Sequence, residues 1–256
     1  MYIDIKNVSI EFQQHKQKFA ALNDISLSIS EGEFICLLGP SGCGKTTLLN
    51  AIAGFEKISS GSIKIAGQEV NKPDAQNTFL FQNYGLLPWR TVQHNVELGL
   101  ENKKLTKDER RQISDKYINL VGLDDFKKRH PNQLSGGMQQ RVAIARALAV
   151  DPKILFMDEP FCALDVITRA NLQDEIIRIW QECRKTVIFV THDIDEAVYL
   201  ADRVVIMTPN PGRIKAVKTI NLGRGRDRTG KEILSIRDHV LEIFEMKNCN
   251  EVEYYL

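Results

Sequence analysis

The stretch GPSGCGKTT occupies residues 39–47, after the apolar run FICLL at Phe34–Leu38, and it continues into the helical pattern TTLLNAIAG. Glycines let successive backbone N–H groups approach a phosphate closely, and Lys45 adds positive charge at the β and γ oxygens. The Thr46 hydroxyl can ligate Mg²⁺. A strand before the loop and a helix after it are the context that this chemistry requires. The stretch therefore predicts a phosphate-binding loop formed by Gly39, Pro40, Ser41, Gly42, Cys43, Gly44, Lys45, Thr46 and Thr47.

Apolar runs that precede helical patterns recur along the chain. KILFM at Lys153–Met157 leads through a loop into a helical pattern, and TVIFV at Thr186–Val190 leads into DIDEAVYLA. Repeated strand-then-helix units predict a parallel sheet covered by helices. About thirty residues at the start and SIKIAGQEV at Ser62–Val70 favour antiparallel strands, whereas Thr91–Ala149 is mainly helical in pattern. We expect an α/β fold with an N-terminal antiparallel β subdomain and an inserted α-helical subdomain at about 91–149.

The composition of the 256-residue chain argues against several classes of protein. A formal net charge of +1 gives no bulk attraction to nucleic acid or to an anionic membrane. The five cysteines are odd in number and contain no CxxC pair, so neither a disulfide framework nor a zinc site is expected. The start MYIDIKN lacks a signal-peptide pattern, and no apolar run approaches the ~20 residues that span a bilayer. We expect a protein of the reducing cytosol without a nucleic-acid partner.

Two carboxylates follow the apolar strand ILFM. Asp158 and Glu159 therefore lie at the carboxyl edge of the sheet, where open α/β sheets bind ligands. Asp158 suits coordination of Mg²⁺, and Glu159 suits the role of general base toward an attacking water. Either acid alone could equally cap a helix, but their pairing with the glycine loop favours catalysis.

Two further polar residues follow strands that end at the same edge. Gln82 comes after TFLF and His192 comes after TVIFVT, so each can reach a γ-phosphate or its water. We expect His192 to serve catalysis and Gln82 to serve both catalysis and the metal site. A single histidine at a strand end is more often structural, and the neighbouring motifs reverse that expectation here. The other histidines lack such neighbouring motifs and are expected to have no catalytic role: His15, His94, His130 and His239.

A second phosphate-binding motif lies about ninety residues after the first. Leu134–Arg141 reads LSGGMQQR, and a Ser-Gly-Gly that opens a helix presents backbone N–H groups to an anion. The glycine loop alone would hold one nucleotide. The presence of both motifs therefore needs an explanation.

The motifs together resemble the ATP-binding subunits of ABC transporters. The quoted loop, the FQ of Phe81 and Gln82, LSGGMQQR, ILFMDEP, the ALD of residues 163–165 and the TH at Thr191 follow the order and spacing of that family. The resemblance covers residues 1–215 and implies a P-loop NTPase with a RecA-like parallel-sheet core. Residues 216–256 form a short C-terminal extension. Within it, the basic cluster RGRDR from Arg224 is expected to be a solvated loop.

The resemblance implies a head-to-tail homodimer that explains the two phosphate motifs. ATP would be held by the glycine loop of one subunit and by Ser135, Gly136 and Gly137 of the other. Met138 replaces the glutamine of the family's LSGGQ. Asp165 would lie across the dimer interface. Phe12 would stack on adenine, with Phe19 as the alternative.

The resemblance also implies coupling to transport. Leu86, Leu87, Pro88 and Trp89 follow Gln82, where the family receives a helix of its membrane permease, although Trp89 could instead be a core residue. LLPWRTVQHNV, DEPFCALDVITR and the PGRI of Pro211–Ile214 are similar to the branch that imports nitrate, sulfonate, taurine and bicarbonate. This branch implies a permease, indirectly a solute-binding protein, and a peripheral location on the cytoplasmic face of the membrane. An exporter ATPase and a soluble ABC-type ATPase remain alternatives.

Overall fold

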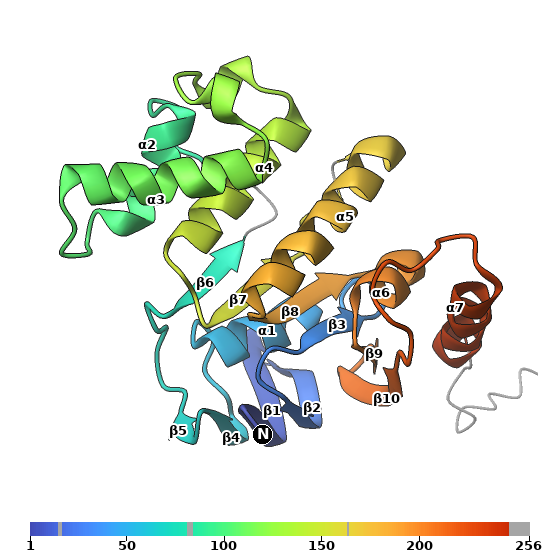
Figure 1. Cartoon of the computed structure of the whole chain (residues 1–256). Coiled ribbons are helices and arrows are strands. Elements are labelled where there is room, and N and C mark those ends of the chain that lie inside the picture. The colour runs from blue at the N-terminus through green and yellow to red at the C-terminus, as the bar shows by residue number, and fades with distance from the viewer. Residues whose placement is uncertain (15–16, 81–83, 163, 246–256) are drawn as a thin grey trace, which may run out of the picture.

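The computed structural model describes residues 1–14, 17–80, 84–162 and 164–245, and its centre is a six-stranded sheet (Figure 1). The strands in order of pairing are β10 (Arg213–Thr219), β9 (Arg203–Thr208), β3 (Phe34–Leu38), β8 (Thr186–Thr191), β7 (Ile154–Asp158) and β6 (Asn77–Leu80). In this order of pairing, β9, β3, β8, β7 and β6 run parallel to one another. Strand β10 pairs antiparallel with β9. Every residue of β3 and β8 is buried, as expected for parallel strands covered on both faces.

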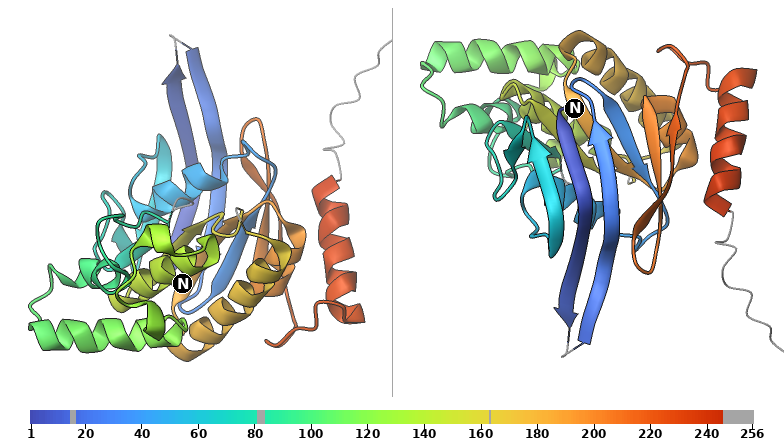
Figure 2. Two further views of the ribbon diagram at one scale, coloured as in Figure 1. Left: turned by 90° about the horizontal axis from the view of Figure 1, so that it is seen from above. Right: turned by 90° about the horizontal axis from the view of Figure 1, so that it is seen from below.

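An antiparallel sheet forms a second layer. Its order is β2 (Gln17–Ile29), β1 (Ile3–Gln14), β4 (Ser60–Ile65) and β5 (Gln68–Glu69). Strands β1 and β2 form a long ribbon that extends beyond the other two strands (Figure 2). The N-terminal antiparallel strands expected from the sequence are therefore present.

Successive residues of β3 enter two different cores, because side chains of a strand alternate between the faces of its sheet. Ile35 and Leu37 pack into a core shared with α1 (Lys45–Ala53) and the antiparallel sheet. Phe34, Cys36 and Leu38 pack into the core on the other face. That second core is covered by α4 (Gly136–Ala149), α5 (Val166–Cys183) and α6 (Ile194–Leu200).

The segment between β6 and β7 is mainly helical. Its described residues form α2 (Val92–Glu97), α3 (Lys107–Leu120), α4 and short 3₁₀ turns at Leu98–Leu100, Asp124–Phe126 and Pro131–Gln133. Helix α3 begins in a capping box, in which Thr106 and Glu109 satisfy each other's backbone N–H groups. Helices α2, α3 and α4 stand together at one end of the molecule (Figure 1). The expected α/β fold with a parallel core, an antiparallel sheet and an inserted helical part is confirmed.

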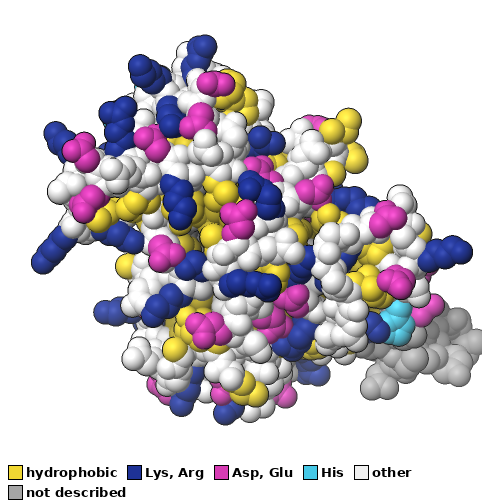
Figure 3. All heavy atoms as spheres, in the orientation of Figure 1, with side chains coloured by type: hydrophobic (Ala, Val, Ile, Leu, Met, Phe, Trp, Pro, Cys, Tyr) yellow, Lys and Arg dark blue, Asp and Glu magenta, His cyan; other side chains and the backbone are white. Residues whose placement is uncertain are grey.

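The last described element is α7 (Lys231–Glu245), which packs at the edge of the molecule beside α6 (Figures 1 and 2). Among the helices of the described residues, none is both long and apolar enough to cross a membrane. Basic and acidic side chains are interspersed over the face drawn in Figure 3. This distribution fits the near-neutral net charge of the sequence.

Candidate active site

The glycine loop connects β3 to α1 and packs tightly against neighbouring backbone. Gly44 has φ of 90°, and a Cβ atom there would lie 2.5 Å from Cδ2 of Leu22 in β2. A Cβ atom on Gly39 would lie 2.5 Å from Sγ of Cys43 and 2.9 Å from the carbonyl oxygen of Met207. Only glycine fits these two positions. The Cys43 side chain is buried in the core, so this residue can offer only its backbone to a ligand at the loop.

Lys45 opens α1, and its ammonium group lies inside the loop. Its Nζ atom donates to the carbonyl oxygens of Gly39 at 2.7 Å and Pro40 at 3.1 Å. The side chain is only 5% exposed, so these carbonyl partners compensate for the loss of water. The loop therefore holds a cation at its centre, where the sequence predicts phosphate oxygens.

Thr46 and Asp158 meet at the carboxyl edge of the sheet. The Thr46 hydroxyl donates to Oδ1 of Asp158 at 3.1 Å. Burial raises the pKa of the Asp158 carboxyl above its usual value, and the nearby Glu159 charge adds to this effect, while the Thr46 hydrogen bond and the Lys45 charge oppose it. A partly buried carboxylate beside a hydroxyl oxygen suits a hard divalent cation, and Mg²⁺ takes few protein ligands because it keeps several waters. The residues present fit a magnesium ion.

Glu159 lies between two nitrogen atoms from other elements. Its Oε2 is 3.2 Å from Nδ1 of His192, which follows β8, and its Oε1 is 3.9 Å from Nζ of Lys45. Glu159 has φ of 43°, a value that residues with a side chain rarely adopt. Its backbone N–H donates to the carbonyl oxygen of Val190 at 3.1 Å, which holds this turn against β8. The structure thus brings together Lys45, Thr46, Asp158, Glu159 and His192.

Ser135 caps the helix that carries the second phosphate motif. Its Oγ accepts a hydrogen bond from the backbone N–H of Met138 at 3.3 Å, and α4 begins at Gly136. The first N–H groups of a helix lack partners within it and favour negative charge. Helix α4 packs into the core on one face of the central sheet, and α1 packs into the core on the other face. Ser135 and Lys45 therefore lie at the starts of two helices that pack on opposite faces of the sheet.

Gly137 has a packing role that the sequence does not reveal. A Cβ atom at this position would lie 2.7 Å from Cγ2 of Thr168 in α5. By contrast, a Cβ atom on Gly136 would find its nearest neighbour, the hydroxyl of Tyr84, at 3.8 Å. Helices α4 and α5 approach closely at Gly137 because this residue has no side chain.

Asp165 caps the start of α5. Its side chain accepts from the backbone N–H of Thr168 at 3.0 Å, and this bond lowers the pKa of the Asp165 carboxyl. Val166 and Ile167 follow it and are 80% and 74% exposed. Two neighbouring apolar side chains in solvent suit contact with another protein surface.

Phe12 and Phe19 are direct partners across the β1–β2 ribbon, and both are exposed. Side chains that are directly opposite in an antiparallel pair share one face. The alternative between them therefore concerns two adjacent rings on the same surface. Gln82 lies outside the described residues.

Comparison with known proteins agrees with the geometry. The profile of the ABC transporter family matches residues 22–162. An uncharacterized ABC transporter ATP-binding protein of Methanocaldococcus jannaschii is 51% identical over 95% of this chain and 91% of its own length. The chain belongs to the ABC transporter family. It is an ATP-binding subunit with ATPase activity, as the resemblance in sequence implies.

Other relatives and solved structures of ABC cassettes are also similar. The nitrate import ATP-binding protein NrtD of Synechococcus elongatus is 47% identical over 85% of this chain and 80% of its own. The bicarbonate transport ATP-binding protein CmpD of the same species is 45% identical over 89% and 83%. An ATP-binding cassette solved as a dimer in a post-hydrolysis state with ADP and Pi superposes with a TM-score of 0.76, at 34% identity over 86% of this chain and all of that one. CbiO1 of Clostridium perfringens, part of the ABC transporter complex CbiONQ, gives 0.79 at 26% identity over 94% of both chains.

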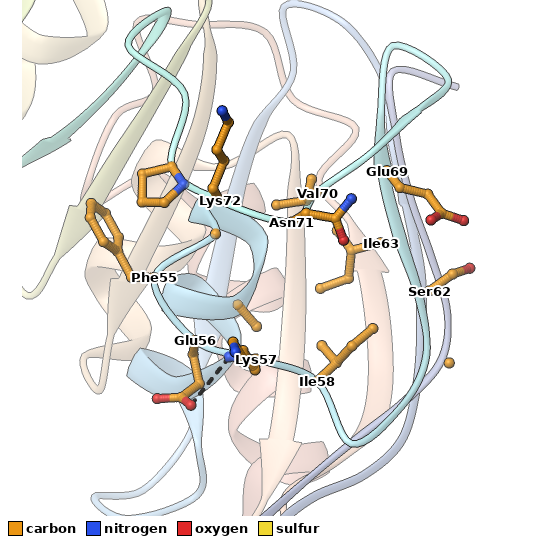
Figure 4. Close-up of a pocket in the computed structure, with 14 residues that line it drawn as sticks. Phe55, Glu56, Lys57, Ile58, Ser62, Ile63, Glu69, Val70, Asn71 and Lys72 are labelled. Atoms are coloured by element: carbon orange, nitrogen blue, oxygen red, sulfur yellow. Dashed lines mark hydrogen bonds between the residues drawn. The ribbon is translucent and has the colours of Figure 1, made fainter.

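A hollow of about 400 Å³ in this ABC cassette lies between the end of α1 and the β4–β5 hairpin (Figure 4). Ile58, Ile63 and Val70 face one another across it, and Glu69 and Lys72 point outward at its rim (Figure 4). Residues 39–47 do not line it. Because the side chains drawn there do not converge as polar groups in a ligand site do, we do not assign this hollow to the nucleotide.

The segment proposed for docking of a permease is partly exposed in this ABC cassette. Trp89 is 72% exposed, which excludes the alternative that it is a core residue. Pro88 is exposed, and Leu86 and Leu87 are partly buried. An exposed tryptophan beside apolar neighbours is typical of a protein contact.

The basic cluster RGRDR is only in part the solvated loop that the sequence suggested, because Arg228 and Asp227 are exposed while Arg226 is buried and Arg224 is partly buried. Arg226 is only 8% exposed, and its guanidinium donates to main-chain oxygens at the end of α6. Arg224 lies over the ring of Trp180, 4.4 Å from its centroid, and Arg228 lies 3.5 Å from that of Tyr199. Burial lowers the pKa of Arg226 to about 10, and the carbonyl oxygens that it contacts satisfy its N–H groups in place of water. Composition alone could not show this, because the partners lie on α5, α6 and the strands.

Proposed function

We propose that this ABC ATPase subunit powers the import of a small anion of the nitrate, sulfonate, taurine or bicarbonate class. The observation that carries this proposal is the 45–47% identity with ATPases named for nitrate import and bicarbonate transport, which extends over 85–89% of the chain. The aligned region is much longer than the nucleotide-binding motifs.

The chemistry follows from the groups at the sheet edge. Thr46 and Asp158 would hold Mg²⁺, which would neutralise charge on the phosphate oxygens. Lys45 exchanges its carbonyl partners for β and γ oxygens of ATP. Glu159 accepts a proton from the attacking water, and His192 holds the Glu159 carboxylate through Nδ1 and can meet the γ-phosphate through Nε2. Gln82, whose role is inferred from the sequence alone, would complete the metal site and orient the water.

ATP is held between two copies of the chain in head-to-tail orientation. The glycine loop of one copy provides Lys45, and the capped start of α4 in the other provides Ser135 and the N–H groups that follow it. A dimeric cassette with ADP and Pi among the similar structures supports this arrangement. The exposed Val166 and Ile167 beside Asp165 then lie against the partner.

The membrane partner is a permease that docks on the segment containing Trp89, and a solute-binding protein delivers the anion to that permease. The subunit is then a peripheral protein on the cytoplasmic face of the membrane. CbiO1 is part of the ABC transporter complex CbiONQ, and its likeness to this chain supports a membrane assembly.

Affinity purification from detergent-solubilised membranes tests the proposal. The tagged chain should bring down a polytopic membrane protein, and Trp89→Ser should lose it while retaining ATP binding. Val217→Ser is the matched control, because Val217 is an exposed apolar residue of β10. In proteoliposomes with the solute-binding protein, ATP should drive inward transport of labelled nitrate, sulfonate, taurine or bicarbonate. Outward transport would indicate an exporter, and the lack of any membrane partner would contradict a transport role.

A further inference from the structure

The C-terminal segment after β10 caps the short helix that follows His192. Nη1 of Arg226 donates to the carbonyl oxygens of Val198 at 2.6 Å, Tyr199 at 2.9 Å and Ala201 at 2.8 Å. The last carbonyls of a helix have no partner within it, and a cation there also favours the helix dipole. Helix α6 has only seven residues, so its position depends on what holds its two ends.

The other end of α6 is fixed beside the active site. Asp193 directly follows His192 and caps α6, since its Oδ1 accepts from the backbone N–H of Glu196 at 3.1 Å. The backbone N–H of Asp193 in turn donates to Oγ1 of Thr191 at 3.0 Å. A displacement of α6 would therefore move His192 relative to Glu159.

A buried carboxylate connects this turn to α5. Oε2 of Glu196 accepts from the Thr191 hydroxyl at 2.7 Å, and Oε1 accepts from Nε2 of Gln173 at 3.2 Å. Glu196 is 7% exposed, and burial raises the pKa of its carboxyl although the Thr191 hydrogen bond opposes this. Burying such a group costs stability unless its partners are well placed. The position of Glu196 therefore depends on Thr191, on Gln173 and on Arg169, whose Nε lies 3.7 Å from Oε1 of Glu196 and whose Nη1 donates to Oδ2 of Asp193 at 3.4 Å.

Arg228 continues the series of hydrogen bonds to the C-terminal segment. Its Nη1 donates to Oε1 of Gln173 at 2.6 Å, and its Nη2 donates to Oδ1 of Asp174 at 2.6 Å. The Gln173 amide thus accepts from Arg228 with its oxygen and donates to Glu196 with its nitrogen. Because both ends of this amide are engaged, Arg228 fixes its orientation.

We propose that Arg228 is a positioning residue for ATP hydrolysis, which acts through Gln173, Glu196 and Thr191 to present His192 to Glu159. This inference rests on the proposed role of His192. The segment that carries Arg228 after β10 then contributes to catalysis through the residues that it positions.

A double-mutant cycle tests the proposal. Arg228→Ala in the purified full-length chain should lower kcat about tenfold while leaving the KM for ATP and the nucleotide stoichiometry unchanged. The same substitution in a His192→Ala background should have little further effect, with residual turnover measured from radiolabelled ATP. Gln173→Ala should reproduce the loss, and Gln173→Ala with Arg228→Ala should be no worse than either alone. Arg237→Ala is the control. Arg237 lies on α7, and within the described residues its guanidinium donates hydrogen bonds to its neighbour Asp238.

Three outcomes would overturn the inference. The first is that Arg228→Ala lowers kcat by the same factor in the parent chain and in the His192→Ala variant. A general loss of stability would have this result, because it does not depend on His192. The second is an equal loss in Arg237→Ala. The third is unchanged kcat in Arg228→Ala while His192→Ala is impaired. If His192→Ala alone keeps normal turnover, the proposed role of His192 fails first, and that result is distinct from the other three.

Discussion

Nδ1 of His192 lies 3.2 Å from Oε2 of Glu159, although the two residues follow different strands of the central sheet. Strands β7 and β8 are parallel neighbours, so their carboxyl ends place these side chains together. Glu159 reaches this position with φ of 43°, a conformation that costs about 1–3 kcal/mol. Strain of this kind persists where surrounding contacts enforce it, here the hydrogen bond to Val190 and the contacts with Lys45 and His192. These contacts therefore orient the Glu159 carboxylate toward Lys45 and His192.

Glu159→Gln should keep ATP binding and lose hydrolysis. The amide is nearly the same size but cannot accept the proton of the attacking water, so turnover should fall about 10² to 10⁴-fold. The variant should accumulate as an ATP-bound dimer, which size-exclusion chromatography with radiolabelled ATP measures. Glu182→Gln, at an exposed ion pair of α5, is the control and should keep normal turnover. Near-normal turnover in purified Glu159→Gln would rule out the assignment of this residue as base.

Asp158→Asn should stabilise the nucleotide-free protein while abolishing Mg²⁺-dependent hydrolysis. The pKa of Asp158 is raised in the folded chain, chiefly by burial, so the folded state binds the proton more tightly than the unfolded state. The free energy of unfolding of the parent protein therefore falls as the pH rises through the pKa of Asp158 in the folded state. The stability of Asp158→Asn does not change over this range for the same reason, because its amide does not titrate. Thermal unfolding should show a higher Tm for Asp158→Asn at pH 7 and a smaller difference at acidic pH. A lower Tm at pH 7 would contradict this electrostatic account.

The sequence was sufficient to place the side chains at the sheet edge. Apolar runs such as ILFM and TVIFVT show where parallel strands end, and residues that follow them must share one edge. This reasoning applies to Asp158 and His192 because it needs only the order of strands and loops. The adenine contact is less determined, since Phe12 and Phe19 are adjacent on one ribbon and the sequence cannot choose between them.

Contacts between distant elements could not be predicted in this way. The RGRDR cluster looks like a solvated loop because its charges are close in sequence, yet Arg226 is buried against carbonyls of α6. Gly137 looks like a phosphate contact alone, yet its missing side chain also lets α4 approach Thr168. Both roles depend on how helices pack, which hydrophobic periodicity does not specify.

Gly137→Ala should destabilise the protein, whereas Gly136→Ala should not. Alanine normally favours a helix over glycine by up to about 1 kcal/mol. At Gly137 the added Cβ atom would lie 2.7 Å from Cγ2 of Thr168, while at Gly136 the nearest atom is 3.8 Å away. Combining Gly137→Ala with Thr168→Ser, which removes that methyl group, should restore part of the loss. Equal Tm values for the two alanine variants would show that the contact is not limiting.

Lys45→Ala and Ser135→Phe together test whether one ATP site contains parts of two chains. Lys45→Ala removes the cation of the glycine loop, and Ser135→Phe places a ring where the γ-phosphate should lie. Each homodimer should therefore fail to trap nucleotide. Ser135→Phe also removes the cap of α4, which costs about 1 kcal/mol, so its folding is checked by thermal unfolding.

Mixing the two variants should restore one site in each heterodimer, because Lys45 of the Ser135→Phe chain then faces Ser135 of the Lys45→Ala chain. The second site of the same heterodimer is defective in both groups. Hydrolysis can require two intact sites, so the measurement is Mg-ATP-dependent dimerisation and trapped nucleotide after verified exchange of subunits. The mixture should trap up to about half as much nucleotide per chain as the parent dimer, reduced further by the homodimers that remain. If Ser135 served the nucleotide of its own chain, every site would contain a defect and mixing would recover nothing.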